Sequence, residues 1–177
     1  MSDFPLPALT LVLGGAASGK SAFAERLVAQ TGRPRVYLAT AQAYDAEMAA
    51  KVAAHQSQRG AGWHTIEAPH DIATPLANAA ASQIVLLDCA TLWLSNALLA
   101  NVPAADAVNN FVNAIAARTT PLVIVSNEVG AGIVPENALA RAFRNAQGAL
   151  NQAVAARADL VVNVIAGLPM ALKGQLG

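Results

Sequence analysis

The stretch Leu9-Thr10-Leu11-Val12-Leu13-Gly14-Gly15-Ala16-Ala17-Ser18-Gly19-Lys20-Ser21 decides the fold. Its apolar first part predicts a buried strand, and residues 22–30 have the composition of a helix. The Gly-x-x-x-x-Gly-Lys-Ser spacing between them therefore lies in the strand-loop-helix context that a phosphate-binding loop requires. Backbone N–H groups of such a loop, and of the helix after it, point at phosphate oxygens. We expect Gly14, Gly15, Ala16, Ala17, Ser18, Gly19, Lys20 and Ser21 to bind a nucleotide.

Two side chains of this loop have separate roles. Lys20 is expected to reach the β- and γ-phosphates, and the Ser21 hydroxyl is expected to coordinate Mg²⁺. The alternative is an ordinary glycine-rich turn between a strand and a helix. We disfavour it because both glycines, the Lys-Ser pair and the strand are all in register.

Length, charge and cysteine content limit the class of protein. The 177 residues show no linker, repeat or low-complexity segment, so we expect one domain over residues 1–177. Eleven basic and eleven acidic residues give a net charge of zero with no basic stripe, which argues against a nucleic-acid partner. The single cysteine, Cys89, fits a reducing compartment, and we expect a cytoplasmic protein. The uncharged residues 89–105 are too short for a membrane span.

Apolar runs alternate with helical segments along the whole chain. The expected strands after the loop are residues 35–40, 63–67, 84–88, 121–126 and 160–166, of which 160–166 is the last. The expected helices are residues 44–58, 71–82, 91–94, 104–118 and 136–157. This order predicts a three-layer α/β fold with a mainly parallel sheet.

Polar residues end two of these strands at the edge where the phosphate loop is expected. Asp88 follows a continuous apolar strand and is a candidate to hold Mg²⁺ opposite Ser21. The alternative is that Asp88 caps the helix that begins near Thr91. Glu128, after the strand 121–126, can activate an attacking hydroxyl, or it can order the glycine-rich loop that follows.

Seven stretches together resemble one family closely, over residues 11–173. It is the bifunctional adenosylcobinamide kinase / adenosylcobinamide-phosphate guanylyltransferase family of cobalamin biosynthesis. The Asn-Glu-Val-Gly-x-Gly-Ile-Val-Pro run is far more specific than the phosphate loop alone. Besides the phosphate loop, the matching stretches are Tyr37-Leu38-Ala39-Thr40-Ala41, Asp45-x-Glu47-Met48 with His55-x-x-x-Arg59, Trp63-x-Thr65-x-Glu67, residues 87–96, residues 126–135 and Leu150-Asn151-Gln152.

The resemblance implies two reactions. First, ATP or GTP phosphorylates the aminopropanol hydroxyl of adenosylcobinamide. Second, GTP guanylylates an enzyme histidine, which here is His55, and the phosphorylated cobinamide takes the GMP to give adenosylcobinamide-GDP. A neutral imidazole can attack phosphorus, and Arg59 lies one helical turn on, where it can neutralise phosphate charge. The resemblance also implies a RecA-type fold and a homotrimer, which would suit the 55% apolar composition.

Further nucleotide contacts follow from the same resemblance. They are Ala39, Thr40, Ala41, Gln56, Ser57, Gln58, Arg59, Glu67 and Asp88. The Glu67 carboxylate can accept hydrogen bonds from guanine or ribose, although a solvated charge at a strand end is the plain alternative.

The chain departs from the family pattern at Ala17, Ala90 and Asn145, and Ala17 removes a cation beside the phosphates. Two rival functions remain open. One is a phosphate-loop kinase of another small alcohol, which leaves His55 without a role, and the other is a nucleotide-binding regulatory module without catalysis. If His55 is not the nucleophile, His64 is the next candidate.

Overall fold

The computed structural model describes residues 6–42 and 61–176. They form a seven-stranded sheet in which neighbouring strands are parallel, except that the last strand runs antiparallel to its neighbour. In spatial order the strands are β3 (Trp63–Glu67), β2 (Arg35–Ala39), β4 (Ile84–Asp88), β5 (Leu122–Asn127), β1 (Leu9–Gly14), β6 (Leu160–Ile165) and β7 (Leu168–Lys173). The prediction of a mainly parallel α/β sheet is confirmed.

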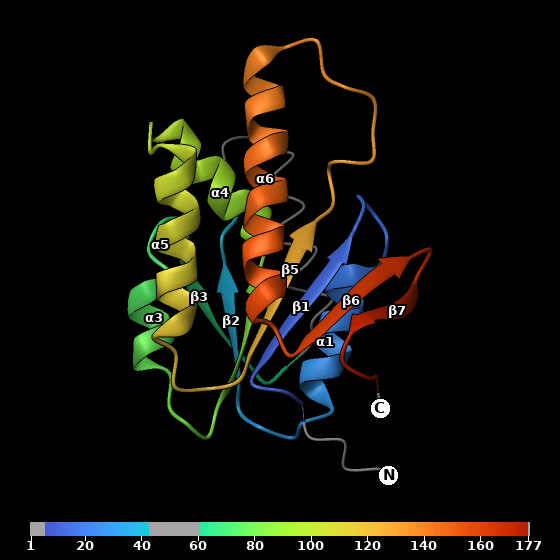
Figure 1. Ribbon diagram of the computed structural model, residues 1–177. Coiled ribbons are helices and arrows are strands. Elements are labelled where there is room, and N and C mark those ends of the chain that lie inside the picture. The colour runs from blue at the N-terminus through green and yellow to red at the C-terminus, as the bar shows by residue number, and fades with distance from the viewer. Residues whose placement is uncertain (1–5, 43–60, 177) are drawn as a thin grey trace.

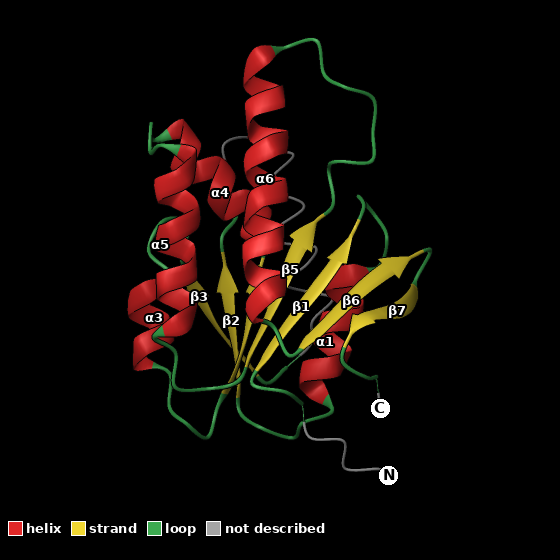
Figure 2. Ribbon diagram, viewed as in Figure 1, coloured by secondary structure: helices red, strands yellow, loops and turns green. Residues whose placement is uncertain are grey.

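Helices cover both faces of the sheet, which gives three layers (Figures 1 and 2). One face carries α1 (Lys20–Ala29). The opposite face carries α3 (Ala73–Asn78), α4 (Ala90–Leu99), α5 (Ala104–Ala116) and α6 (Ala138–Arg157). Each interface has its own hydrophobic core, because the side chains of every central strand alternate between the two faces.

Strand β5 shows how this alternation positions the site. Leu122 and Ile124 belong to the core beneath α4–α6, whereas Val123 and Val125 belong to the core beneath α1. Continued to the end of the strand, the same alternation places Ser126 on the α6 face and Asn127 on the α1 face. In β4 it places Asp88 on the α1 face, after Ile84 and Leu86.

Strand β7 was not predicted, since it follows the strand that was expected to be the last. Ala166 and Gly167 have φ values of 51° and 79°, so a two-residue turn with both residues in the left-handed region joins β6 to β7. Every residue of β7 is exposed, and Pro169 lies within it. A strand without a buried face gives no hydrophobic alternation, and proline weakens the pattern further.

Helix boundaries differ from expectation at two places. The helix expected over residues 71–82 is limited to α3, since Asp71 Oδ1 accepts a hydrogen bond from Thr74 N (3.1 Å) before it and Ala79 is extended after it. The helix expected at residues 91–94 continues to Leu99. The helix expected over residues 44–58 lies wholly outside the described residues.

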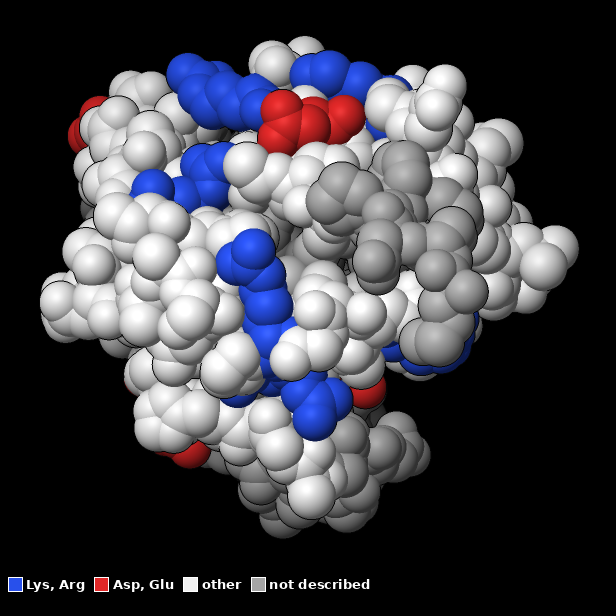
Figure 3. All heavy atoms as spheres, turned by 90° about the horizontal axis from the view of Figure 1, so that it is seen from below, with Lys and Arg blue, Asp and Glu red and all other residues white. Residues whose placement is uncertain are grey.

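The charged surface is mixed on the face that Figure 3 shows. Lys and Arg side chains form several groups separated by uncharged surface, and an acidic group lies beside one of them. In the part of the chain that the structure describes, no helix has the length and apolar character needed to cross a bilayer.

Candidate nucleotide-binding site

The phosphate loop is a tight backbone turn between β1 and α1. Ser18 N donates to Gly15 O (3.3 Å), Ala17 has a φ of 54°, and Gly19 enters the helix with a φ of 90°. At Gly14 a Cβ would lie 2.7 Å from the Val164 carbonyl oxygen, so only glycine fits there without a shift of the backbone. The motif thus has the curled backbone that its spacing predicts.

Lys20 is the first residue of α1 and lies over this loop. Its Nζ donates to Gly15 O at 3.0 Å, which leaves two ammonium hydrogens for phosphate oxygens. Ser21 is the next residue of the same helical turn and is half-buried. Helix α1 therefore directs its N-terminal N–H groups and a cation to one place.

The turn between β6 and β7 braces the phosphate loop. Gly167 N donates to Ser18 O (2.9 Å), and a Cβ on Gly19 would lie 3.2 Å from Gly167 Cα. This contact was not predicted from the sequence, because it depends on strand β7, which was itself not predicted.

Asp88 ends β4 on the α1 face and accepts a hydrogen bond from Tyr37 OH through Oδ2 (3.1 Å). It does not cap the next helix. The N-cap of α4 is Cys89, whose Sγ accepts from Leu92 N at 3.5 Å. The capping alternative is therefore wrong, and the role of Asp88 in metal binding stays a prediction.

Cys89 and Thr40 lock the junction between β2 and β4. The Thr40 hydroxyl donates to Cys89 O and accepts from Cys89 N, both at 2.7 Å. Burial, reinforced by the charge of Asp88, raises the pKa of the Cys89 thiol to about 12. Because the Thr40 side chain is fully buried in these bonds, residues 39–41 border the site through backbone and the half-buried Ala39 and Ala41.

Asn127 belongs to the family motif of residues 126–135, and no role was predicted for it. It pairs with Gly14 across the sheet, and both of its backbone groups are bonded, N–H to Thr91 Oγ1 (2.8 Å) and C=O to Asn151 Nδ2 (3.1 Å). Its Oδ1 atom is buried without a hydrogen-bond partner among the described residues. The available signal was a polar residue ending an apolar strand, the same signal that singled out Asp88.

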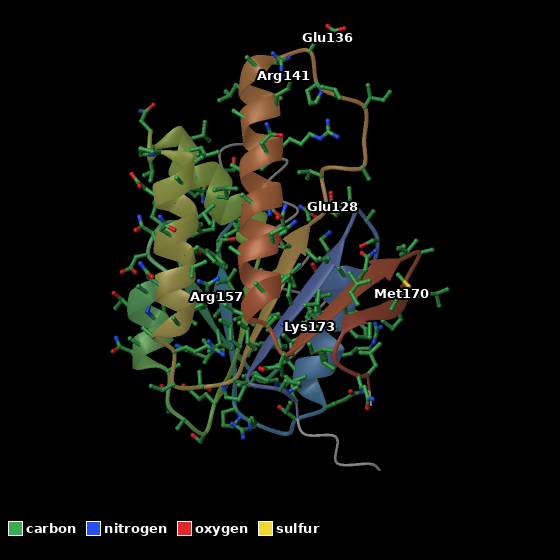
Figure 4. The ribbon with its side chains drawn as sticks, viewed as in Figure 1. Glu128, Glu136, Arg141, Arg157, Met170 and Lys173 are labelled. Carbon is green, nitrogen blue, oxygen red and sulfur yellow. The ribbon has the colours of Figure 1, made fainter. Side chains whose placement is uncertain are left out.

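Glu128 follows Asn127 and orders the loop of residues 128–137. Its backbone N–H donates to Gly14 O at 3.0 Å, and its carboxylate accepts from Gly130 N. Arg144 and Arg141 of α6 donate to carbonyl oxygens further along this loop, at Gly130 and Gly132 and at Pro135 and Glu136. Figure 4 shows Glu128 at the end of β5 and Arg141 near the start of α6.

The other residues predicted to contact the nucleotide or to act in catalysis either lie away from the phosphate loop or fall outside the described residues. Glu67 is exposed at the end of β3, four strand spacings or about 19 Å from β1, so it does not lie beside the phosphate loop. His64 is exposed in β3. The remaining predicted residues, His55, Gln56, Ser57, Gln58 and Arg59, lie outside the described residues.

The oxygen atoms at this edge suit Mg²⁺ bound jointly with phosphates. Among residues 6–42 and 61–176, no group of three or more His, Cys, Asp or Glu side chains is placed to hold a metal ion. Mg²⁺ at a nucleotide site needs only one or two protein oxygens. The Ser21 hydroxyl and the Asp88 Oδ1 atom, which is not the atom bonded to Tyr37, are oxygens of this kind.

The fold and the loop define a phosphate-loop NTPase of RecA-like architecture. Two solved structures show the same fold at low sequence identity. The flagellar accessory protein FlaH of Methanocaldococcus jannaschii has a TM-score of 0.53 and 14% identity, covering 96% of this chain and 80% of that one. The RadB recombinase has a TM-score of 0.53 and 13% identity, covering 88% and 73%.

The chain belongs to the cobinamide kinase / cobinamide phosphate guanyltransferase family, whose family model matches residues 10–172. A bifunctional adenosylcobalamin biosynthesis protein, CobP of Pseudomonas aeruginosa, is 43% identical over 171 residues, which are 93% of this chain and 97% of the relative. The protein of the same description from Salmonella typhimurium, CobU, is 39% identical over 93% of this chain and 99% of its own length. The resemblance on which the sequence analysis relied is thereby confirmed.

Proposed function

We propose that this protein phosphorylates adenosylcobinamide with ATP or GTP and then transfers GMP from GTP to the product, giving adenosylcobinamide-GDP. Family membership supports the pair of reactions. The observation that carries the kinase half is Lys20 at the N-terminus of α1, with its ammonium directly over the phosphate loop. A cation and a helix N-terminus at one point stabilise the charge that builds on a γ-phosphoryl group in transfer.

In the kinase reaction, the loop backbone and Lys20 hold the triphosphate, while Ser21 and Asp88 would hold Mg²⁺. When bound, the metal ion supplies positive charge that neutralises the phosphate oxygens. Glu128 is better suited to ordering the 128–137 loop than to accepting the proton, because its carboxylate already accepts from Gly130 N.

In the guanylyltransferase reaction, the His55 imidazole attacks the α-phosphorus of GTP and pyrophosphate leaves. The phosphate of the cobinamide then attacks the same phosphorus, the P–N bond breaks and the imidazole is released. Arg59 neutralises phosphate charge in both steps, with Gln56, Ser57 and Gln58 as further nucleotide contacts. The distance of about 19 Å between Glu67 and the phosphate loop is compatible with a contact between Glu67 and the guanine or ribose end of the nucleotide.

Labelling with GTP that carries radioactive α-phosphate tests this proposal. The wild-type protein should acquire a covalent label that acid removes, since a phosphoramidate hydrolyses once its nitrogen is protonated. His55→Ala should acquire none, yet it should still phosphorylate cobinamide. A wild-type protein that phosphorylates cobinamide without ever becoming labelled would be the simple kinase, and label retained by His55→Ala would move the nucleophile, with His64 next.

We also propose that the protein is a cytoplasmic homotrimer. Its exposed apolar side chains support an assembly, with Ile133 97% and Leu168 72% exposed. Sedimentation should give about three times the 18.1 kDa of one chain. A monomer at micromolar concentration would contradict this assembly.

A further inference from the structure

A groove of about 660 Å³ separates α6 from the loop of residues 128–137. Figure 1 shows this loop as an arch beside the N-terminal half of α6. The side chains and backbone that line the groove are those of Gly130, Val134, Arg141, Arg144, Asn145, Gly148, Ala149 and Gln152. No function assigned so far uses this groove.

The groove begins beside the nucleotide site. Its lower lining residues, Gly148 and Gln152, flank Asn151 on α6, and the Asn151 amide donates to the Asn127 carbonyl (3.1 Å). Asn127 is the strand partner of Gly14, the first residue of the phosphate loop. From Gln152 the groove follows α6 to Arg141, about 16 Å along the helix axis. A ligand lying in it can therefore place one end next to the phosphates.

The lining offers hydrogen bonds to a neutral polar ligand. Arg141 and Arg144 each use one terminal nitrogen, Nη1 and Nη2 respectively, to hold the loop, and their other N–H donors have no bond within the described part of the chain. Asn145 and Gln152 are exposed, and each amide can both donate and accept. The lining contains no acidic residue, and Val134, which is 62% exposed, adds an apolar wall.

We infer that this groove binds the corrin macrocycle of cobinamide by its rim of amide side chains. The inference rests on the proposed function and names the subsite for its acceptor substrate. Amide carbonyls of the ligand accept from Arg141 and Arg144, and its amide N–H groups donate to Asn145 and Gln152. The macrocycle then lies along α6, and the aminopropanol arm extends from the Gln152 end toward the γ-phosphate over Gly14. Such positioning of the acceptor is what a phosphoryl transfer requires from its enzyme.

Gly148 offers a direct way to block the groove. A Cβ at this position meets nothing within 4 Å, so Gly148→Phe projects its ring into the groove without a clash in the core. Replacing a glycine inside a helix also favours the helix. Ala156→Phe is the matched control, because this exposed residue lies two turns further along α6 and outside the groove lining.

The experiment measures three quantities for wild type and both variants: the KM for cobinamide, the KM for ATP, and covalent labelling by GTP, which needs no cobinamide. For Gly148→Phe we expect the KM for cobinamide to rise at least tenfold, with the KM for ATP and the labelling unchanged. Gln152→Ala, which removes one amide without adding bulk, should raise the KM for cobinamide about threefold. Ala156→Phe should match wild type in all three.

The outcomes separate the groove from the proposed function. An unchanged KM for cobinamide in Gly148→Phe, or an equal rise in Ala156→Phe, would overturn the groove as the subsite while the kinase proposal stands. A wild-type protein that neither phosphorylates cobinamide nor binds it in equilibrium dialysis would overturn both. A parallel loss of labelling in Gly148→Phe would place nucleotide, rather than cobinamide, in the groove and would likewise overturn the inference.

Discussion

The phosphate loop and the 128–137 loop leave neighbouring strands at the same edge of the sheet, but different kinds of contact hold them. The phosphate loop is fixed by backbone: Gly15, Gly167 and Glu128 make its main-chain bonds, and Gly14 leaves no room for a side chain. The 128–137 loop is held by side chains reaching to its carbonyls, and a Cβ on Gly132 would meet nothing within 4 Å.

This difference matches the two tasks. Phosphoryl transfer needs donors that do not move as charge develops, so a backbone cradle suits it. The 128–137 loop, tied by arginine side chains, borders the groove that we infer to bind cobinamide. On the inference above, the backbone cradle serves phosphoryl transfer, and the loop tied by side chains serves recognition of the acceptor.

The largest effect is expected from removing the cation of the backbone cradle. Lys20→Ala should lower kcat/KM for cobinamide phosphorylation by about 10²–10³-fold, since the developing phosphate charge loses a preorganised partner. Lys173→Ala is the control, because the Lys173 ammonium donates to the α6 carbonyls of Ala155 and Ala156 at 3.2 Å, and Lys173 lies at the end of β7 opposite the Gly167 turn that contacts the loop. Near wild-type rates in Lys20→Ala would contradict the proposal that Lys20 stabilises the phosphate charge.

The two loops should respond oppositely to an added methyl group. Gly14→Ala places a Cβ 2.7 Å from the Val164 carbonyl oxygen, so it should lower the free energy of unfolding by about 1–3 kcal/mol and weaken ATP binding. Gly132→Ala meets open space and should change stability by less than about 0.5 kcal/mol. Urea unfolding and ATP titration measure both, and equal losses in the two variants would contradict the contrast between the loops.

Most of the central sheet and the phosphate loop could be predicted from the sequence, and the reason is physical. Buried parallel strands are continuous apolar runs, and the phosphate loop has a spacing set by its chemistry, so β1, β4, β5 and the loop were predicted. Contacts between segments far apart in the sequence were not predicted. The bracing turn at Gly167 required the exposed strand β7, which has no hydrophobic pattern.

The roles of single polar residues could not be predicted from the sequence either. Thr40 was expected to contact the nucleotide, yet its hydroxyl donates one hydrogen bond to the Cys89 backbone and accepts another from it. Asp88 could have capped α4, and only the structure shows that Cys89 does so. Asn127 was hidden within a family motif, and its unpartnered Oδ1 atom is visible only with the strands in place.

A smaller effect is expected where side chains alone hold the loop. Arg144→Ala removes the bonds to Gly130 and Gly132, so amide hydrogen exchange in residues 130–134 should become at least roughly fivefold faster, since each lost hydrogen bond is worth about 1 kcal/mol. Exchange in residues 14–21 should stay the same, because no bond of Arg144 reaches them. Faster exchange in both loops would mean that they open as one unit.

The smallest effect concerns Cys89, whose backbone is bonded to the Thr40 hydroxyl at the junction of β4 and α4. Burial raises the pKa of its thiol from 9.0 to about 12, so between these values the unfolded chain loses a proton that the folded chain keeps. Stability contributed by the protonated thiol is therefore complete below pH 9 and falls as the pH rises. At pH 9.5 the loss is about 0.8 kcal/mol relative to pH 8, and its size is set by the pKa of the thiol in the unfolded chain, because the pKa in the folded chain is far above both pH values. Cys89→Ser has no thiol to ionise, so urea unfolding at the two pH values should show a smaller drop for the variant than for wild type. An identical drop in both proteins would mean that the Cys89 thiol ionises as freely in the folded chain as in the unfolded one.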